Sequence, residues 1–200
     1  MKMYERTKRN MERQRKERIR EVYNAFDKGA DVTFFYQDYA MLGPYENVEL
    51  LLKQEFRGDY YFICNMSMSQ RIYIMKLVYD RHVKLIKVSK RNFEKNEMVF
   101  KAWLDTAKFE RKLKLRRTFD YHKSGHVVSY LWISKEQDAL ELVAKKDYNG
   151  KFYFICKKKL KNEICIMRLV YRKGAELMEV SDYEYKNNEK IFDLWLEEAV

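Results

Sequence analysis

The sequence contains little of three residue types that shape small folds: its 200 residues include one Pro, six Gly and three Cys. Because Pro and Gly punctuate turns, their scarcity predicts few turns and long helices and strands. The cysteines Cys64, Cys156 and Cys165 are odd in number, lie in strand-like runs and form no CxxC motif. This pattern predicts reduced, buried thiols in a cytoplasmic protein rather than a disulfide framework.

Long hydrophobic runs and catalytic motifs are also missing. No apolar run approaches the roughly 18 residues that a membrane span needs, and the N-terminus is charged throughout, unlike a signal peptide. We therefore expect no membrane partner. Neither a Gly-rich phosphate loop nor a recognisable spacing of Ser, Cys and His occurs. The sequence predicts no catalytic residue and no cofactor, and hence a protein that is not an enzyme.

Histidine is scarce, and its placement does not favour a metal site. His122 and His126 form an HxxxH pair, but they lie in a predicted loop without an adjacent carboxylate. His82 lies in a predicted hairpin turn. We therefore expect no bound metal.

The most informative feature that is present is an internal repeat. A shift of 92 positions aligns residues 32–107 with residues 124–199 without a gap. Within this register, Gly58–Cys64 (GDYYFIC) falls on Gly150–Cys156 (GKFYFIC). A register held over such a length predicts a tandem duplication, and two copies predict a body with pseudo-twofold symmetry rather than a solenoid.

Each copy is expected to have the element order β-α-β-β-β-α, with antiparallel sheets and helices packed on one face. The first strand is expected near Val32–Tyr39 and Ser124–Ile133, which are rich in β-branched and aromatic residues. A helix should follow, with Pro44 in its first turn in one copy and a capping box at Ser134–Gln137 in the other. Its buried stripe is assigned to Val48, Leu51 and Leu52, and to Leu140, Val143 and Ala144.

A three-stranded meander and a closing helix complete each copy. The meander turns are expected near 67–70 and 80–82, and near 158–162 and 172–174. Phe100, Trp103, Leu104 and Ala107 follow at i, i+3, i+4 and i+7, which is one face at helical period. The aromatic residues of the strands point alternately to both faces, so we expect core packing rather than stacking on RNA bases.

The net charge of +11 is distributed unevenly. Residues 1–28 hold ten Lys or Arg and five Asp or Glu, and residues 108–123 hold seven and two. The two copies are nearly neutral. The sequence therefore predicts four segments: a basic N-terminal helix (1–28), a first α+β repeat (29–107), a basic helical connector (108–123) and a second α+β repeat (124–200).

Two basic helices on a neutral body form an electrostatic footprint for polyanions, and nucleic acid is the first candidate. The expected phosphate-contacting residues are Arg13, Arg15, Lys16, Arg18, Arg20, Lys112, Lys114, Arg116 and Arg117. The simpler interpretation is a pair of solvated faces in which Glu12, Glu17 and Glu21 form intrahelical ion pairs. An acidic protein surface is a further possible partner.

The leading hypothesis is a non-enzymatic protein that binds nucleic acid or a nucleoprotein complex. The abundance of Lys, Asn, Tyr, Phe and Ile resembles proteins of AT-rich bacteria, their phages and plasmids, and favours an accessory protein of a mobile element. The alternative is a protein inhibitor of a host defence nucleoprotein, as anti-CRISPR proteins are.

A third hypothesis is a nuclease that uses the repeated pairs Asn96-Glu97 and Asn188-Glu189 as acid/base groups. Asn followed by Glu is more simply explained as a helix N-cap and a first-turn acid.

Overall fold

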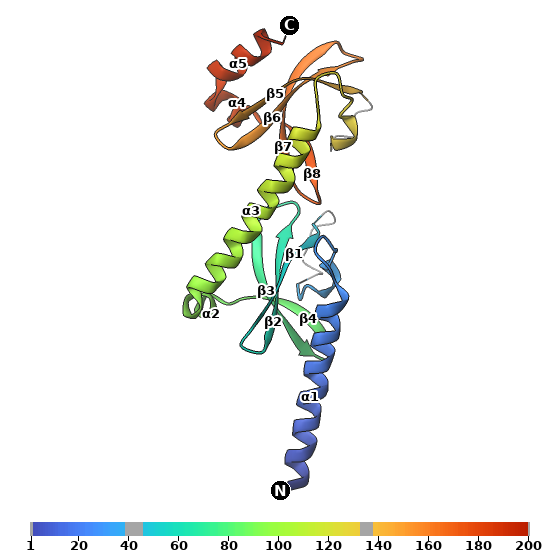
Figure 1. Ribbon diagram of the computed structural model, residues 1–200, viewed down its shortest axis with the longest axis vertical. Helices are drawn as coiled ribbons and strands as arrows, with labels where there is room; N and C mark the ends of the chain where they lie inside the picture. The colour runs from blue at the N-terminus through green and yellow to red at the C-terminus, as the bar shows by residue number, and fades with distance from the viewer. Residues whose placement is uncertain (1, 39–45, 133–137, 200) are drawn as a thin grey trace. The chain divides into compact units, whose positions relative to one another are not determined.

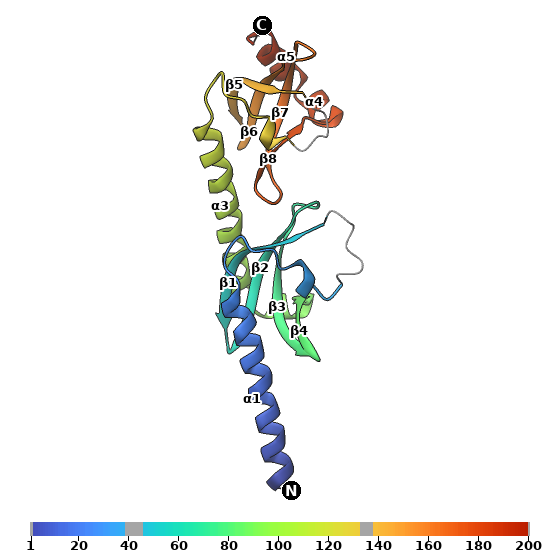
Figure 2. The same cartoon turned by 90° about the vertical axis from the view of Figure 1, so that its right-hand side faces the viewer.

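The computed structural model describes residues 2–38, 46–132 and 138–199. The chain divides into two compact units, residues 1–110 and 111–200. The class is α+β: an N-terminal helix precedes two four-stranded antiparallel sheets, each followed by helices (Figures 1 and 2). Within the described ranges, no helix is long and apolar enough to cross a membrane.

The first unit begins with helix α1 (Lys2–Ala25) and the 3-10 turn η1 (Thr33–Phe35). Its sheet is a meander in the order β1-β2-β3-β4. The strands are β1 (Val48–Phe56), β2 (Asp59–Met66), β3 (Ile72–Asp80) and β4 (His82–Lys87). Helix α2 (Lys90–Lys95) and the long helix α3 (Glu97–Tyr121) follow, and the unit boundary falls within α3.

The second unit repeats this order. The second half of α3 takes the place of α1, and η3 (Ser129–Leu131) takes the place of η1. The meander consists of β5 (Leu140–Tyr148), β6 (Lys151–Lys158), β7 (Glu163–Tyr171) and β8 (Ala175–Glu179). Helices α4 (Asp182–Asn187) and α5 (Glu189–Glu197) follow it. The meander turns and the closing helix after residue 96 agree with the sequence prediction.

Helices cover both faces of each sheet, so the prediction of helices on one face is wrong. In the first unit, Tyr23 of α1 packs on Phe62 with ring centroids 5.8 Å apart. On the opposite face, Phe100 of α3 packs on Tyr61 at 5.6 Å. Adjacent strand residues point to opposite faces, so Tyr61 and Phe62 serve two separate apolar layers.

The second unit has the same two layers. Phe119 of α3 packs on Phe154 at 5.7 Å, while Phe192 of α5 packs on Tyr153 at 5.4 Å. Both layers are buried. A strand covered on both faces is apolar at nearly every position, which explains the long hydrophobic runs of β2 and β6.

The helix predicted over Val48–Leu52 and Leu140–Ala144 is wrong, because these residues lie in strands β1 and β5. The register with the neighbouring strand slips between Leu50 and Leu52, and again between Leu142 and Ala144. Each slip is a β-bulge that inserts one residue into the strand. The bulge interrupts the two-residue alternation and leaves apolar residues at i, i+3 and i+4, which mimics a helical stripe.

The first strand predicted in each copy is also replaced. Residues 33–35 and 129–131 form 3-10 turns, flanked by isolated bridges such as Tyr36 to Leu85 and Trp132 to Leu177. The order β-α-β-β-β-α is therefore corrected to a turn, four strands and two helices. The predicted cap at Ser134–Gln137 and the turn at Pro44 lie outside the described residues.

The gapless repeat needs a correction as well. Val32 donates its N–H to Val48, and Val128 donates to Leu140, in the same structural position. Val128 follows Val32 by 96 positions, whereas Leu140 follows Val48 by 92. The second copy is therefore four residues shorter between its 3-10 turn and its first strand. The tightly paired strands tolerate no length change, whereas a connection at the end of a sheet does.

Candidate nucleic-acid interface

Helix α1 has one supported end and one solvent-exposed end. Ile19, Val22, Tyr23 and Phe26 pack against the core of the first unit. Every residue from 5 to 18 is exposed. Since isolated helices of this length are marginal in water, the packed final turns and the ion pairs along the helix sustain the exposed part.

Four cations form a row along one side of α1. They are Arg9, Arg13, Lys16 and Arg20, and their spacing of four, three and four residues places them on one helix face. The same four side chains line a groove of about 510 Å³ that continues to Gly58 and Tyr60 of the β1–β2 hairpin. Glu12, Glu17 and Glu55 also line this groove, so its charge is basic but mixed.

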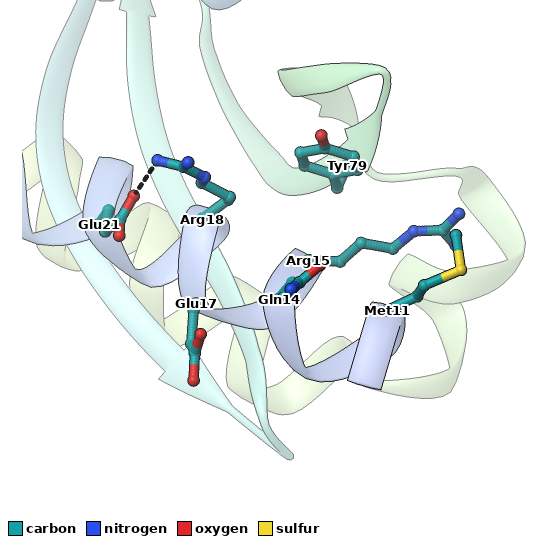
Figure 3. Close-up of a pocket in the computed structure, with 7 residues that line it drawn as sticks. All are labelled: Met11, Gln14, Arg15, Glu17, Arg18, Glu21 and Tyr79. Atoms are coloured by element: carbon teal, nitrogen blue, oxygen red, sulfur yellow. Dashed lines mark hydrogen bonds and ion pairs between the residues drawn. The ribbon is translucent and has the colours of Figure 1, made fainter. Parts of the chain in front are cut away.

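The other two basic residues predicted on α1 lie on a different side. Arg15 and Arg18 line a second groove of about 490 Å³ with Met11 and with Tyr79 of β3 (Figure 3). The side chain of Met11 is 49% exposed. The structure therefore separates the predicted residues of α1 into two groups with different surroundings.

Ion pairs along α1 involve some of these cations. Arg13 lies 2.9 Å from Glu17. Arg18 lies 3.1 Å from Glu21, as Figure 3 shows. Both pairs are solvent-exposed, so each contributes less than about 1 kcal/mol to stability. A phosphate can therefore replace the carboxylate at little cost. Within the described part of the chain, Lys16 and Arg20 form no ion pair. The prediction of intrahelical pairs is confirmed for Glu17 and Glu21.

The predicted connector residues are divided between internal contacts and solvent. Lys114 donates to the Tyr171 hydroxyl at 2.7 Å, and Arg116 pairs with Asp147 at 2.8 Å. The Arg116 guanidinium also lies 5.6 Å from the Phe152 ring centroid. Both cations therefore hold α3 on the sheet of the second unit.

Lys112 and Arg117, the remaining predicted connector residues, are exposed. The segment that they share with Leu115 and Phe119 is a core-packing helix rather than a bare basic rod.

The repeated Asn-Glu pairs lie at helix junctions. The Asn96 and Asn188 side chains donate back to the carbonyl groups of Asn92 and Glu184, four residues earlier. Asn188 is the N-cap residue of α5, but its side chain makes no capping bond. Glu97 is the first residue of α3 and lies 2.6 Å from Lys101. These contacts give Asn96, Glu97 and Asn188 structural roles.

No group of three or more His, Cys, Asp or Glu residues in the described ranges is arranged to hold a metal ion. The thiols of Cys64, Cys156 and Cys165 are free. Burial raises the pKa of the Cys165 thiol to about 11, and Lys158 and the nearby carboxylates act on it more weakly. Such a thiol is protonated at neutral pH and is a poor nucleophile.

Sequence reasoning missed Arg9, which completes the basic row and was detectable from its spacing to Arg13. It also missed Phe34 and Tyr130, the exposed aromatic residues of the two 3-10 turns. The shift of 92 positions aligns neither of them with the other. Comparison of the chain with protein-family models, curated proteins and solved structures gave no match.

Proposed function

We propose that the chain binds nucleic acid through the basic row of α1, which consists of Arg9, Arg13, Lys16 and Arg20. The observation that carries this proposal is a set of four cations on one face of an exposed helix, lining one groove. A stable fold does not require such a row, because like charges at this spacing repel each other. A bound polyanion neutralises these charges, and the relief of their mutual repulsion contributes to the binding free energy.

The dimensions of the row suit a phosphate backbone. Arg9 and Arg20 are eleven residues apart, which corresponds to roughly 16 Å of helix axis. One strand of a B-form duplex presents a phosphate about every 3.4 Å along its axis, so the row spans at most about five phosphates. Contacts of this kind supply affinity without reading sequence. Lys112 and Arg117 provide similar exposed cations in the second unit.

We further propose that the two units arose by tandem duplication, and that the chain is an accessory protein of a bacterial mobile element. The equivalent bulges, 3-10 turns and two-layer cores support the duplication. The composition supports the second part of this proposal. The connector residues Lys114 and Arg116 are the weakest members of the predicted set, because they already bind partners within their own unit.

The experiment is anisotropy binding to labelled single-stranded RNA, single-stranded DNA and duplex DNA over a salt series. The test variant carries Glu at the four positions of the basic row. The slope of log affinity against log salt is negative, and loss of four phosphate contacts should make it shallower by about 3 for single strands. The matched control carries Glu at four exposed cations of α2 and α3: Lys90, Arg91, Lys95 and Lys101.

The control produces the same net-charge change at a different place. If the control weakens binding as much as the test variant, the effect comes from overall charge and the assignment to α1 is wrong. If the wild-type protein binds no nucleic acid at physiological salt, direct binding is refuted. The inhibitor hypothesis is then favoured, with α1 docked on an acidic surface of a nucleoprotein. Met11 and Tyr79 would supply apolar contacts beside Arg15.

A further inference from the structure

The two units present an exposed aromatic ring at the same structural position. Phe34 is the middle residue of η1 and is 68% exposed, and Tyr130 is the middle residue of η3 and is 69% exposed. Tyr130 follows Phe34 by 96 positions, the spacing that also relates Val32 to Val128. The correspondence becomes visible once the four-residue length difference is included.

Both rings stand on rigidly held turns. The hydroxyl oxygen of Thr33 accepts a hydrogen bond from the Val48 N–H at 2.9 Å, and the hydroxyl oxygen of Ser129 accepts one from the Leu140 N–H at 2.7 Å. Each bond ties its turn to the first strand of the adjacent sheet. An aromatic residue on such a turn loses little conformational entropy when it binds a ligand.

The fold does not use these rings as core. In each turn the following residue, Phe35 or Leu131, packs against the apolar layer, while the middle residue faces solvent. The Phe34 and Phe35 ring centroids lie 3.9 Å apart, with the ring planes tilted by 40°. The Tyr130 hydroxyl lies 3.0 Å from His122 Nε2, which holds the ring in place. A large aromatic residue is therefore exposed at the same position in both units, although neither ring is part of the apolar core.

We infer that Phe34 and Tyr130 are stacking positions for unpaired bases, so that the ligand of the proposed function is a single-stranded nucleic acid. This inference rests on that proposed function. Base–aromatic stacking tolerates any sequence, because every base has a π face. In a duplex the base faces are already stacked on each other, so exposed rings favour single strands. The cations of α1 supply phosphate contacts, and the rings supply the preference for unpaired bases.

The test measures affinity for a single-stranded RNA, a single-stranded DNA, a duplex and an abasic strand of equal length. Phe34→Ala and Tyr130→Ala are each expected to weaken binding to at least one of the single strands by about tenfold, the effect of losing one stacked base. Binding to the duplex and to the abasic strand is expected to stay unchanged. Phe34→Trp and Tyr130→Trp should bind single strands at least as tightly as the wild-type protein does, because Trp offers a larger π face.

The matched control is Tyr183→Ala. Tyr183 is 79% exposed, but Arg91 occupies the equivalent position of the first unit, so this aromatic residue is not repeated. Unchanged single-strand affinity of both Ala variants overturns the inference, as does an equal loss on the abasic strand or in the Tyr183 variant. If reversal of the α1 cations abolishes binding while the ring variants bind normally, the proposed function stands and the stacking inference fails.

Discussion

The ammonium nitrogen of Lys145 lies 2.6 Å from the carbonyl oxygen of Phe119, in the last turn of α3. In the first unit, Lys53 donates to the carbonyl oxygen of Tyr23 at 3.2 Å, in the last turn of α1. Each lysine comes from the first strand of its sheet and also lies over the ring of the residue that it caps. A strand cation thus satisfies a helix-end carbonyl and complements the negative end of the helix dipole.

Replacement of Lys145 by Met is expected to lower the free energy of unfolding by about 1–2 kcal/mol, because it removes a charge-assisted hydrogen bond and a cation–π contact. The adjacent Lys146 serves as the control. It pairs with Glu198 at the surface, and Lys146→Met should cost less than about 1 kcal/mol. Urea denaturation measures both changes. Equal costs would show that the helix cap contributes nothing beyond surface charge.

Glu184 connects α4 to the sheet of the second unit. Its carboxylate oxygens lie 2.8 Å from Lys151 Nζ, 2.8 Å from the Tyr153 hydroxyl and 2.7 Å from an Arg168 guanidinium nitrogen. Burial alone would raise the pKa of Glu184, but the hydrogen bonds from Lys151 and Tyr153, together with the Arg168 charge, hold it below its usual value. The ionised carboxylate therefore stabilises the folded state.

Glu184→Gln is expected to destabilise the protein by about 1.5–3 kcal/mol at neutral pH, because it removes charge from several hydrogen bonds at once. Because the folded-state pKa of Glu184 is lowered, its contribution is present above the unfolded pKa and is lost as the pH falls through the folded value. The difference between wild type and variant should therefore shrink in acid. Thermal melting at neutral and acidic pH checks this, and a difference independent of pH contradicts it.

His122 makes stability depend on pH near neutrality. Burial lowers the pKa of its imidazole, and the charges of His126 and Lys145 lower it further. The folded state therefore favours neutral imidazole, whereas an unfolded His titrates near about 6.5. The resulting stability is fully present above the unfolded pKa and is lost as the pH falls through the folded value.

His122→Gln should flatten the pH dependence of the unfolding free energy as the pH falls below the unfolded pKa of histidine. Gln retains a hydrogen-bonding group for the Tyr130 hydroxyl but does not titrate. The exposed His82 provides the control, because His82→Gln removes an imidazole that is not part of this buried cluster. A variant profile identical to that of the wild type would assign the pH dependence to other groups.

The hairpin between β5 and β6 turns through Asn149 and Gly150, with φ angles of 51° and 70°. Two successive positive φ angles are typical of a type I′ turn, and Asn tolerates the first position better than Ala. Asn149→Ala should therefore lower the free energy of unfolding by about 1 kcal/mol. Ser69→Ala, at an exposed turn residue without positive φ, is the thermal-melting control. An Asn149 variant as stable as this control would contradict the strain argument.

Much of the fold was predictable from local pattern. Phe100, Trp103 and Ala107 follow a helical period and lie on a helix, and the alternating runs of the meander became strands. Prediction failed at Leu51 and Val143, where a bulge changed the spacing of apolar residues. Whether apolar residues spaced in this way form a helix or a bulged strand depends on the neighbouring strand, which lies outside the local window.

Some features of the candidate site were also predictable from the sequence, and others were not. The basic character of α1 and the row of cations along it follow from the order of residues, because helical geometry alone places Arg13, Lys16 and Arg20 on one face. The roles of Lys114 and Arg116 did not follow, since their partners Tyr171 and Asp147 are distant in sequence.

The sequence by itself determined the meander turns, the long helices and the excess of positive charge on α1, because each of these depends on residues close together in the chain. The tertiary structure decided which helix covers which face, which cations remain available to a ligand, and that Phe34 and Tyr130 are equivalent exposed residues. These properties depend on contacts between distant segments and on the length of one connection, and hydrogen bonds such as those of Thr33 and Ser129 establish them only when the chain is folded.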